Sequence, residues 1–202
     1  MRSNETTAVT SYSSVFLKKS GLVRCARGFF LLALVAALAW PAGLRAGSAQ
    51  QREYEIKAAY LYNFINYIDW PADALPATGG TITIGIVGEN PFGEALDPLN
   101  GKQVKGRTLV VKQIAEPKDL DQYQIVFFSS SEKQHVPELL DKLKDSRILT
   151  VSEIDGFAQR GGIINFISEH NKVRFEINPD AARRLGLTIS SELLKLAKLV
   201  KS

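Results

Sequence analysis

The stretch from Gly156 to Asn178 constrains the fold most, because it contains the pattern of a β-hairpin. Apolar residues alternate with other residues in two short runs, Ile163–Ile167 and Val173–Ile177, and the polar tetrapeptide Ser168–Asn171 joins them. This pattern predicts two antiparallel strands connected by a tight turn. Pro179 has no N–H to donate and biases Asn178 away from helix, so we expect the second strand to end there.

Four apolar runs before the hairpin predict strands, and the segments around them predict helices. β-Branched residues dominate the run Thr81–Val87, which is typical of a strand buried on both faces. The other expected strands are Arg107–Ile114, Ile125–Phe128 and Arg147–Val151, and the expected helices are Glu53–Ile68, Pro91–Leu96, Val136–Lys144, Pro179–Leu185 and Ser190–Val200. Strands that alternate with helices and end in a hairpin predict an α/β fold. We expect a three-layer α/β/α sandwich, with a mostly parallel sheet and an antiparallel edge hairpin.

Four segments, taken in order, resemble the sequence signatures of a known family. They are Lys57–Phe64 (KAAYLYNF) with Trp70-Pro71, Gly88–Gly93 (GENPFG), the hairpin stretch Gly156–Asn178 (with GFA, GGIINF and NKVRFEIN), and Leu187–Leu194 (LTISSELL). Together they make the chain similar to the YfiR/HmsC family of periplasmic repressors of membrane-bound diguanylate cyclases. The resemblance runs from about Tyr54 to the end of the chain.

The resemblance implies a non-enzymatic regulator without a cofactor. Members of this family bind the periplasmic sensor domain of a membrane-bound diguanylate cyclase and favour its inactive state, which keeps cyclic di-GMP and biofilm formation low. An outer-membrane lipoprotein relieves the repression by sequestering the repressor. The family branch that depends on disulfides is not matched, because the only cysteine is Cys25.

Residues 1–49 have the pattern of a signal peptide, and residues 50–202 are then a single YfiR-like α/β domain in the periplasm. A basic region that includes Lys18 and Lys19 precedes the apolar run Phe29–Trp40, which is short for a membrane span. Small residues at Gly47 and Ala49 predict cleavage after Ala49, with Ala46 as the second choice. The alternative is an uncleaved membrane anchor.

Removal of this segment changes the charge of the protein. The whole chain carries 25 basic and 21 acidic residues. Residues 1–49 contain six basic residues and one acidic residue, which leaves 19 basic and 20 acidic residues and a net charge of −1. Nucleic-acid binding requires a basic face, so the mature composition gives no support to a nucleic-acid partner.

The first expected helix carries a second apolar stripe besides its core-facing one. At about 100° per residue, Ile56, Tyr60 and Tyr67 lie away from the stripe that contains Leu61 and Phe64. Tyrosine suits half-exposed protein contacts, so these three residues are candidates for a partner contact or a homodimer contact. The alternative is that another part of the same chain covers them.

The second strand of the hairpin places three charged side chains on one face. Lys172, Arg174 and Glu176 are spaced two residues apart and therefore point to the same side. They are candidates for the polar rim of a protein interface. The alternative is that they protect an edge strand from unwanted pairing.

Polar residues follow the expected strands at their carboxyl ends, where open α/β sheets collect ligands. The candidates for binding a small anion are Glu89, Asn90, Ser129, Ser130, Ser131 and Ser152. They support a second hypothesis, a periplasmic module that binds a small ligand in the crevice at the strand ends. The alternative is that the serines cap helices.

Catalytic and metal-binding motifs do not emerge from the sequence. The two histidines, His135 and His170, have no histidine or cysteine at helical metal-ligand spacing. There is no Gly-x-Ser-x-Gly nucleophile motif, and Gly88–Gly93 lacks the lysine and hydroxyl residue of a phosphate-binding loop. We therefore expect neither an enzyme nor a metal site.

Overall fold

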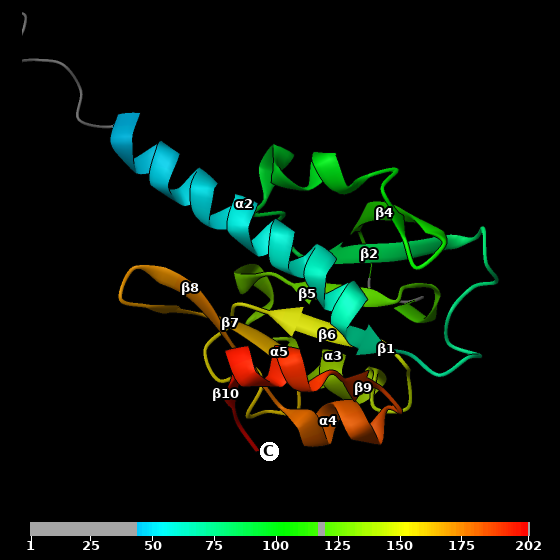
Figure 1. Cartoon of the computed structure of the whole chain (residues 1–202). Helices are drawn as coiled ribbons and strands as arrows, with labels where there is room; N and C mark the ends of the chain where they lie inside the picture. The colour runs from blue at the N-terminus through cyan, green and yellow to red at the C-terminus, as the bar shows by residue number, and fades with distance from the viewer. Residues whose placement is uncertain (1–43, 117–119, 202) are drawn as a thin grey trace, which may run out of the picture. The chain divides into compact units, whose positions relative to one another are not determined.

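The computed structural model of the protein describes residues 44–116 and 120–201, with side chains described from Ala49 onward (Figure 1). The chain divides into two compact units, Met1–Leu44 and Arg45–Ser202. Apart from Leu44, the first unit lies outside the described residues, as does most of the expected signal peptide.

An eight-stranded, mostly parallel sheet organises the second unit, so the expected mixed α/β fold with a mostly parallel sheet is confirmed. The strand order is β10-β8-β7-β6-β5-β2-β4-β3. The strands are β2 (Thr81–Val87), β3 (Gln103–Val104), β4 (Arg107–Ile114), β5 (Ile125–Phe128), β6 (Leu149–Ser152), β7 (Ile164–Glu169), β8 (Lys172–Ile177) and β10 (Lys198–Leu199). β7 and β8 pair antiparallel around the predicted turn, with Phe166 opposite Phe175.

The helices and short segments connect these strands. They are α2 (Leu44–Tyr67), α3 (Val136–Lys142), α4 (Pro179–Arg184), α5 (Ser191–Leu196) and the 3₁₀ turns η1 (Gly93–Leu99), η2 (Leu120–Gln122) and η3 (Ser130–Glu132). A separate two-stranded sheet pairs β1 (Ile68–Asp69) with β9 (Thr188–Ile189). Within residues 44–116 and 120–201, no helix combines the length and apolar character needed to cross a membrane.

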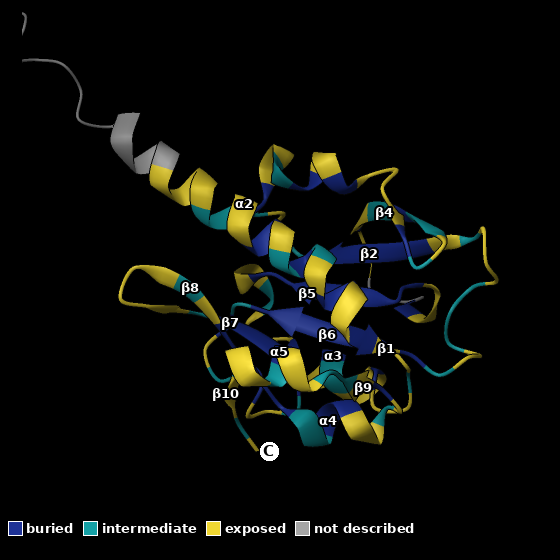
Figure 2. Cartoon of the chain, in the orientation of Figure 1, coloured by how far each residue is buried: buried dark blue, intermediate teal, exposed yellow. Residues whose placement is uncertain are grey.

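Alternate residues of the central strands enter two separate hydrophobic clusters. In β5, Ile125 and Phe127 belong to a cluster with residues of α2, α4 and α5, whereas Val126 and Phe128 belong to a cluster with residues of α3. Successive side chains of a strand point to opposite faces, so both faces of the sheet are covered. This explains why β2 and β5 are continuously apolar, and Figure 2 shows the central strands as buried.

Helix α2 is longer than predicted. It begins at Leu44 instead of Glu53, and the predicted cleavage position Ala49 lies inside it. At its other end the helix passes directly into β1, where Ile68 pairs with Ile189 and Ser190 N donates to Tyr67 O over 2.9 Å. The end of α2 is therefore attached to the C-terminal part of the chain.

The last predicted helix, Ser190–Val200, is wrong in its second half. Ser190 caps α5 by accepting a hydrogen bond from Leu193 N at 3.2 Å, but the helix ends at Leu196. Lys198 and Leu199 instead form β10, which pairs parallel with Glu176 and Ile177 of β8. The apolar stripe that favoured a longer helix is only partly buried, because Leu193 is 3% exposed but Leu196 is 63% exposed. At the base of the hairpin, β10 and not β8 is therefore the edge strand of the sheet.

A buried carboxylate explains the position of β10. Glu176 is only 4% exposed, and it accepts hydrogen bonds from Lys198 Nζ at 2.9 Å and from Gln159 Nε2 at 3.0 Å. Burial alone raises the pKa of the Glu176 carboxyl, but these hydrogen bonds outweigh burial and lower the pKa below its usual value of 4.5. The carboxylate therefore remains charged and binds the side chain of Lys198 in β10.

The lowered pKa of Glu176 predicts a stability loss in acid. Because the folded pKa lies below the unfolded one, its contribution is present above about pH 4.5 and is lost as the pH falls through the folded pKa. Glu176→Gln should lower the free energy of unfolding by roughly 1 kcal/mol at pH 7. Urea denaturation from pH 7 to 3 should show the difference from wild type shrinking with acidity. A difference that stays constant with pH, or one matched by the exposed control Glu192→Gln, would contradict this account.

Candidate functional site

An aromatic cluster joins helix α2 to the hairpin, the two elements predicted to contact a partner. Tyr60 and Phe64 come from α2, and Phe166 and Phe175 come from the antiparallel strands β7 and β8. The ring centroids of Tyr60 and Phe175 are 5.2 Å apart in an edge-on arrangement, and those of Phe64 and Phe166 are 5.8 Å apart in a stacked arrangement. Such pairs contribute beyond their buried area, so α2 and the base of the hairpin form one packed surface.

An ion cluster around a buried lysine forms a second connection between α2 and the sheet. Lys57 is 5% exposed, and its Nζ lies 2.6 Å from Glu53 Oε1 and 2.7 Å from Glu153 Oε2. Tyr54 donates its hydroxyl hydrogen to Glu153 Oε1 over 3.2 Å. Burial and the neighbouring Glu153 carboxylate both raise the pKa of the Tyr54 phenol, so it stays protonated. The sequence does not reveal this cluster as a whole. Only the Glu53–Lys57 pair, four residues apart on one helix, could be expected from it.

The three predicted partner-contact residues of α2 have different environments. Ile56 is 46% exposed and Tyr67 is 40% exposed, whereas Tyr60 is half-buried against Phe64 and the hairpin phenylalanines. Another part of the same chain therefore covers one side of Tyr60. At about 1.5 Å per residue, Ile56 and Tyr67 lie roughly 16 Å apart along the helix, with Tyr60 between them.

The three predicted partner-contact residues of β8 also differ. Lys172 and Arg174 are exposed, and Arg174 Nε lies 3.8 Å from Glu169 Oε2. Glu176 is buried and engaged by Gln159 and Lys198, so its carboxylate is not at the surface. Figure 2 shows exposed residues along the outer part of the hairpin and buried residues at its base.

The predicted ligand-binding residues at the strand ends lie close together, but their hydroxyls are engaged within the chain. Ser129 and Ser131 share a 2.8 Å hydrogen bond, and Glu89 N donates to Ser131 Oγ over 3.0 Å. Ser130 donates to Glu153, and Ser152 Oγ donates to Phe128 O over 2.8 Å. Asn90 Oδ1 accepts from Phe92 N at 3.0 Å. These contacts tie the turns after β2, β5 and β6 to one another.

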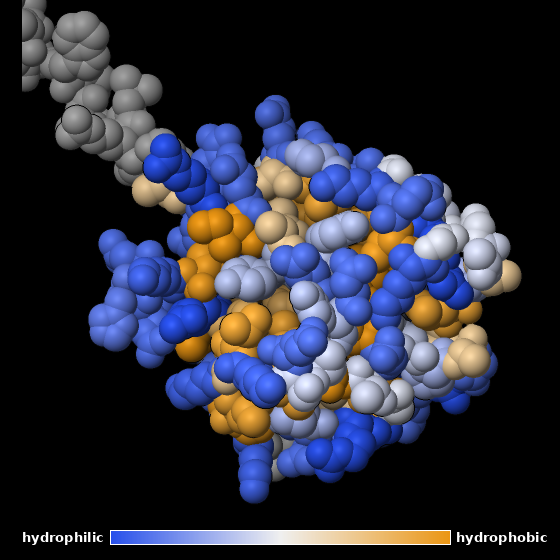
Figure 3. All heavy atoms as spheres, in the orientation of Figure 1, coloured by the Kyte–Doolittle hydropathy of each residue, from blue (hydrophilic) through white to orange (hydrophobic). Residues whose placement is uncertain are grey.

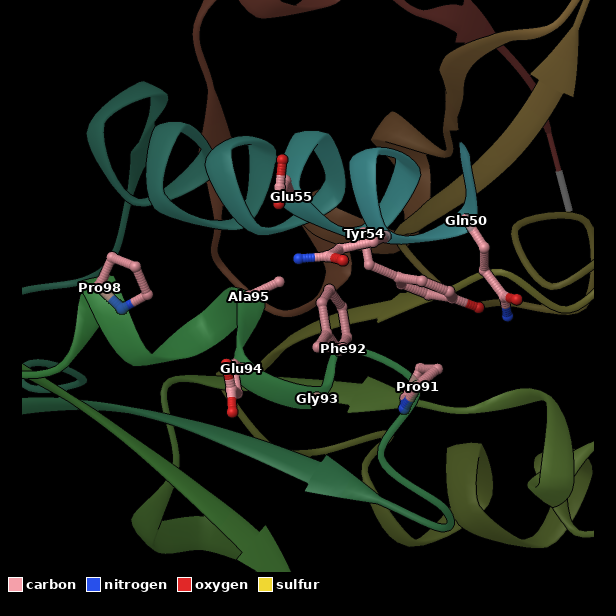
Figure 4. A pocket seen from close by; sticks show the side chains of 10 residues that line it. Gln50, Tyr54, Glu55, Pro91, Phe92, Gly93, Glu94, Ala95 and Pro98 are labelled. Atoms are coloured by element: carbon pink, nitrogen blue, oxygen red, sulfur yellow. The ribbon is translucent and has the colours of Figure 1, made fainter. Parts of the chain in front are cut away.

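A separate cavity of about 600 Å³ lies between residues 50–55 of α2 and the segment that follows β2 (Figure 4). Its lining includes Tyr54, Phe92 and Pro91, and the rings of Tyr54 and Phe92 meet edge-on with centroids 5.4 Å apart. None of the six predicted ligand-binding residues lines this cavity. Within the described ranges, no group of three or more histidine, cysteine, aspartate or glutamate residues is arranged to hold a metal ion.

A comparison with models of known protein families shows to which family the chain belongs. The model of a family described as YfiR/HmsC-like matches residues 54–198. The chain belongs to the YfiR/HmsC-like family. This confirms the resemblance inferred from the four sequence segments, and the match begins within α2 and runs through the hairpin to Lys198 of β10. The YfiR/HmsC-like family is regulatory and not catalytic, and membership suggests a periplasmic regulator of a diguanylate cyclase.

Solved structures add information about the fold of this YfiR/HmsC-like chain. A conserved domain protein from Vibrio cholerae is similar with a TM-score of 0.52 and 13% identity, over 73% of this chain and 60% of that one. This likeness concerns the fold alone, and the chain spans less than two thirds of that protein. The ABC domain from Streptococcus pneumoniae in complex with L-Trp has a TM-score of 0.44 and 12% identity, over 59% of this chain and 55% of that one. No curated protein matches the sequence.

The packing of Tyr60 and Tyr67 predicts that their truncation has effects of different size. Tyr60→Ala removes a ring that packs on Phe64, Phe166 and Phe175, and should lower the free energy of unfolding by about 2 kcal/mol. Tyr67→Ala removes a more exposed ring and should change it by less than about 1 kcal/mol. Urea denaturation measures both, with Tyr60→Phe as the control that keeps the ring. Equal losses for the two alanine variants would contradict the assignment of Tyr60 to the cluster.

Proposed function

We propose that this chain is a non-enzymatic periplasmic repressor that binds the periplasmic sensor domain of an inner-membrane diguanylate cyclase. Binding keeps the cyclase inactive and thereby lowers cyclic di-GMP and biofilm formation. The observation that carries the proposal is the YfiR/HmsC-like family match over residues 54–198. The proposal includes export through a signal peptide that is cleaved after Ala49, and release of repression by an outer-membrane lipoprotein.

The environments of the two histidines fit a regulatory function better than a catalytic one. His135 is exposed, and its Nδ1 lies 3.1 Å from Glu132 Oε2 of the preceding turn. His170 lies in the hairpin turn with a φ of 51°. The contacts of the described residues place neither histidine beside a serine, cysteine or lysine in a nucleophile–base arrangement. This supports a protein that acts by binding.

Repression by binding is a shift in population between two states of the cyclase. A protein that binds both states equally well shifts nothing, so the repressor acts only through its higher affinity for the inactive state. A shift from 1% to 99% inactive cyclase requires a preference of about 10⁴-fold. A surface of fixed shape favours such a preference, because less conformational freedom is lost on binding. The aromatic cluster and the Lys57 ion cluster provide this, because they hold α2 to the sheet at two separate points.

The exposed parts of α2 and of the hairpin are the proposed contact surface. On α2 they include Ile56 and Tyr67, and on β8 they include Lys172 and Arg174. This set combines apolar and charged groups, as the core and rim of a protein interface do. The same surface suits a homodimer contact, which remains the alternative for the residues on α2.

The second hypothesis, a small ligand held at the strand carboxyl ends, has weaker support. The hydroxyls of Ser129, Ser131 and Ser152 are satisfied by contacts within the chain. Ser129 also accepts a hydrogen bond from Ser131 N at 3.3 Å, which makes it the cap of η3. A ligand at this position would have to displace these internal hydrogen bonds.

Measurement of cyclic di-GMP in cells tests the repressor function. Deletion of the gene should raise cyclic di-GMP, because the cyclase loses the protein that favours its inactive state. Deletion of the gene together with that of the partner cyclase should abolish the rise. The control is re-expression of the full-length chain, which should restore the low level. Equal cyclic di-GMP in wild type and single deletion, with both proteins present in the wild type, would reject the repressor function.

A further inference from the structure

The outer part of the hairpin extends beyond the rest of the sheet. β6 pairs with β7 only at Ile164 and Asn165, and β10 pairs with β8 only at Glu176 and Ile177. Phe166–Phe175, here called the hairpin arm, thus has no strand neighbour on either side among the described residues. Figure 1 shows the arm as a two-stranded ribbon that projects from the sheet. A ribbon of two strands is marginally stable in water, so a third strand would stabilise it.

The pairing register shows which backbone groups the arm presents on the β8 side. The turn residues His170 and Asn171 have φ angles of 51° and 59°, as in a two-residue type I′ turn, and Glu169 and Lys172 flank them as a pair. Such a flanking pair is hydrogen-bonded, and the pairs alternate along an antiparallel ladder. Val173 therefore directs its N–H and C=O away from β7. Ile177, four residues on, must do the same, and Val200 N does donate to Ile177 O over 2.9 Å.

The open edge of β8 carries positive charge. Lys172 and Arg174 are both exposed, and the remaining charged group of the strand, Glu176, is buried and engaged by Lys198. Arg174 has one carboxylate nearby, Glu169, at 3.8 Å. The space-filling view shows hydrophilic side chains over the projecting hairpin (Figure 3). The edge thus combines unpaired backbone groups with cations and no exposed acid on the same strand.

This charge pattern disfavours a second copy of the chain as the occupant. Two copies of β8 that pair antiparallel around Val173 place Lys172 opposite Arg174 of the other copy. A shift of the pairing by two residues places Arg174 opposite Arg174 of the other copy. Like charges directly opposite each other destabilise strand pairs, so the edge suits a segment that supplies carboxylates at alternate positions.

We propose that the Lys172–Phe175 edge of β8 is a docking site for an acidic, extended segment of a partner protein, which adds as a strand beside the hairpin arm. Main-chain hydrogen bonds to Val173 provide the pairing, as in other cases of strand addition, and carboxylates opposite Lys172 and Arg174 provide the selectivity. This deepens the proposed function, because it names how the regulatory partner is bound.

The test uses residues 50–202 and two synthetic ten-residue peptides, one alternating glutamate with valine and one alternating lysine with valine. NMR titration should shift the amide signal of Val173 with the glutamate peptide and not with the lysine peptide. Lys172→Glu together with Arg174→Glu should weaken binding about tenfold or more. Lys112→Glu together with Lys133→Glu makes the same charge change at exposed positions elsewhere and should leave the peptide affinity of the edge within roughly twofold.

Substitution of Val173 separates the backbone contact from the side chain. Val173→Pro removes the outward N–H, while the ladder with β7 does not use that group, so peptide binding should be lost. Val173→Ala removes the side chain and keeps the N–H, and should retain binding within roughly threefold. Thermal melts and amide spectra verify that both variants are folded. No shift at Val173 up to millimolar peptide, or equal binding of both peptides, would overturn the proposal, and the charges would then only protect the edge.

Complementation in cells distinguishes failure of this proposal from failure of the proposed function. The double charge reversal at Lys172 and Arg174 should fail to restore low cyclic di-GMP in the deletion strain, whereas the Lys112 and Lys133 control should restore it. Full restoration by the edge variant would contradict docking of the cyclase at this edge and leave the repressor function intact. A deletion without any effect on cyclic di-GMP would reject the repressor function, and the peptide titration alone would then decide the docking site.

Discussion

The packing of Tyr60 and Phe64 against Phe166 and Phe175 is the interaction on which the rest of the candidate surface depends. It brings together a helix near the start of the described chain and a hairpin about 100 residues later. Phe64 is fully buried and Phe166 and Phe175 are 2% exposed, so the cluster also closes the hydrophobic core at the hairpin base. The cluster thereby links the exposed face of α2 directly to that of β8.

The Lys57 ion cluster has a different physical character and a different consequence. A buried ion pair contributes little net stability, but removal of one partner leaves an uncompensated charge. The contacts of Lys57 with Glu53 and Glu153 therefore fix the position of the middle of α2 on the strand ends and add little to the strength of its packing. The aromatic and ionic contacts together hold the helix in one position.

Most of the fold could be predicted from the sequence, because local patterns determine the strands and the hairpin turn. The runs Thr81–Val87 and Ile125–Phe128 are strands with the predicted boundaries. The misassigned segment Lys198–Leu199 illustrates the limit: its helical apolar spacing is outweighed by pairing with β8 and by the buried carboxylate of Glu176. That contact links positions 22 residues apart, and local periodicity carries no information about it.

The candidate site was less predictable than the fold for the same reason. The sequence indicated that Lys172, Arg174 and Glu176 share one face, but not that the last of them is buried and bound to Gln159 and Lys198. It placed serines at the strand ends, but not the hydrogen bonds that engage them. Lys57 and Glu153 are 96 residues apart, so only the folded chain shows that they form one cluster.

Hydrogen-exchange mass spectrometry of residues 50–202, alone and with the purified periplasmic domain of the partner cyclase, tests the central claim most directly. That claim is that the cyclase is bound by a preformed surface of α2 and the hairpin arm. The account predicts slower exchange on binding in two segments, the exposed turns of α2 around Ile56 and residues 169–175 of the arm, with little change in β2 and β5. Unchanged exchange in both segments, or slower exchange confined to the opposite side of the sheet around α3, would contradict the claim.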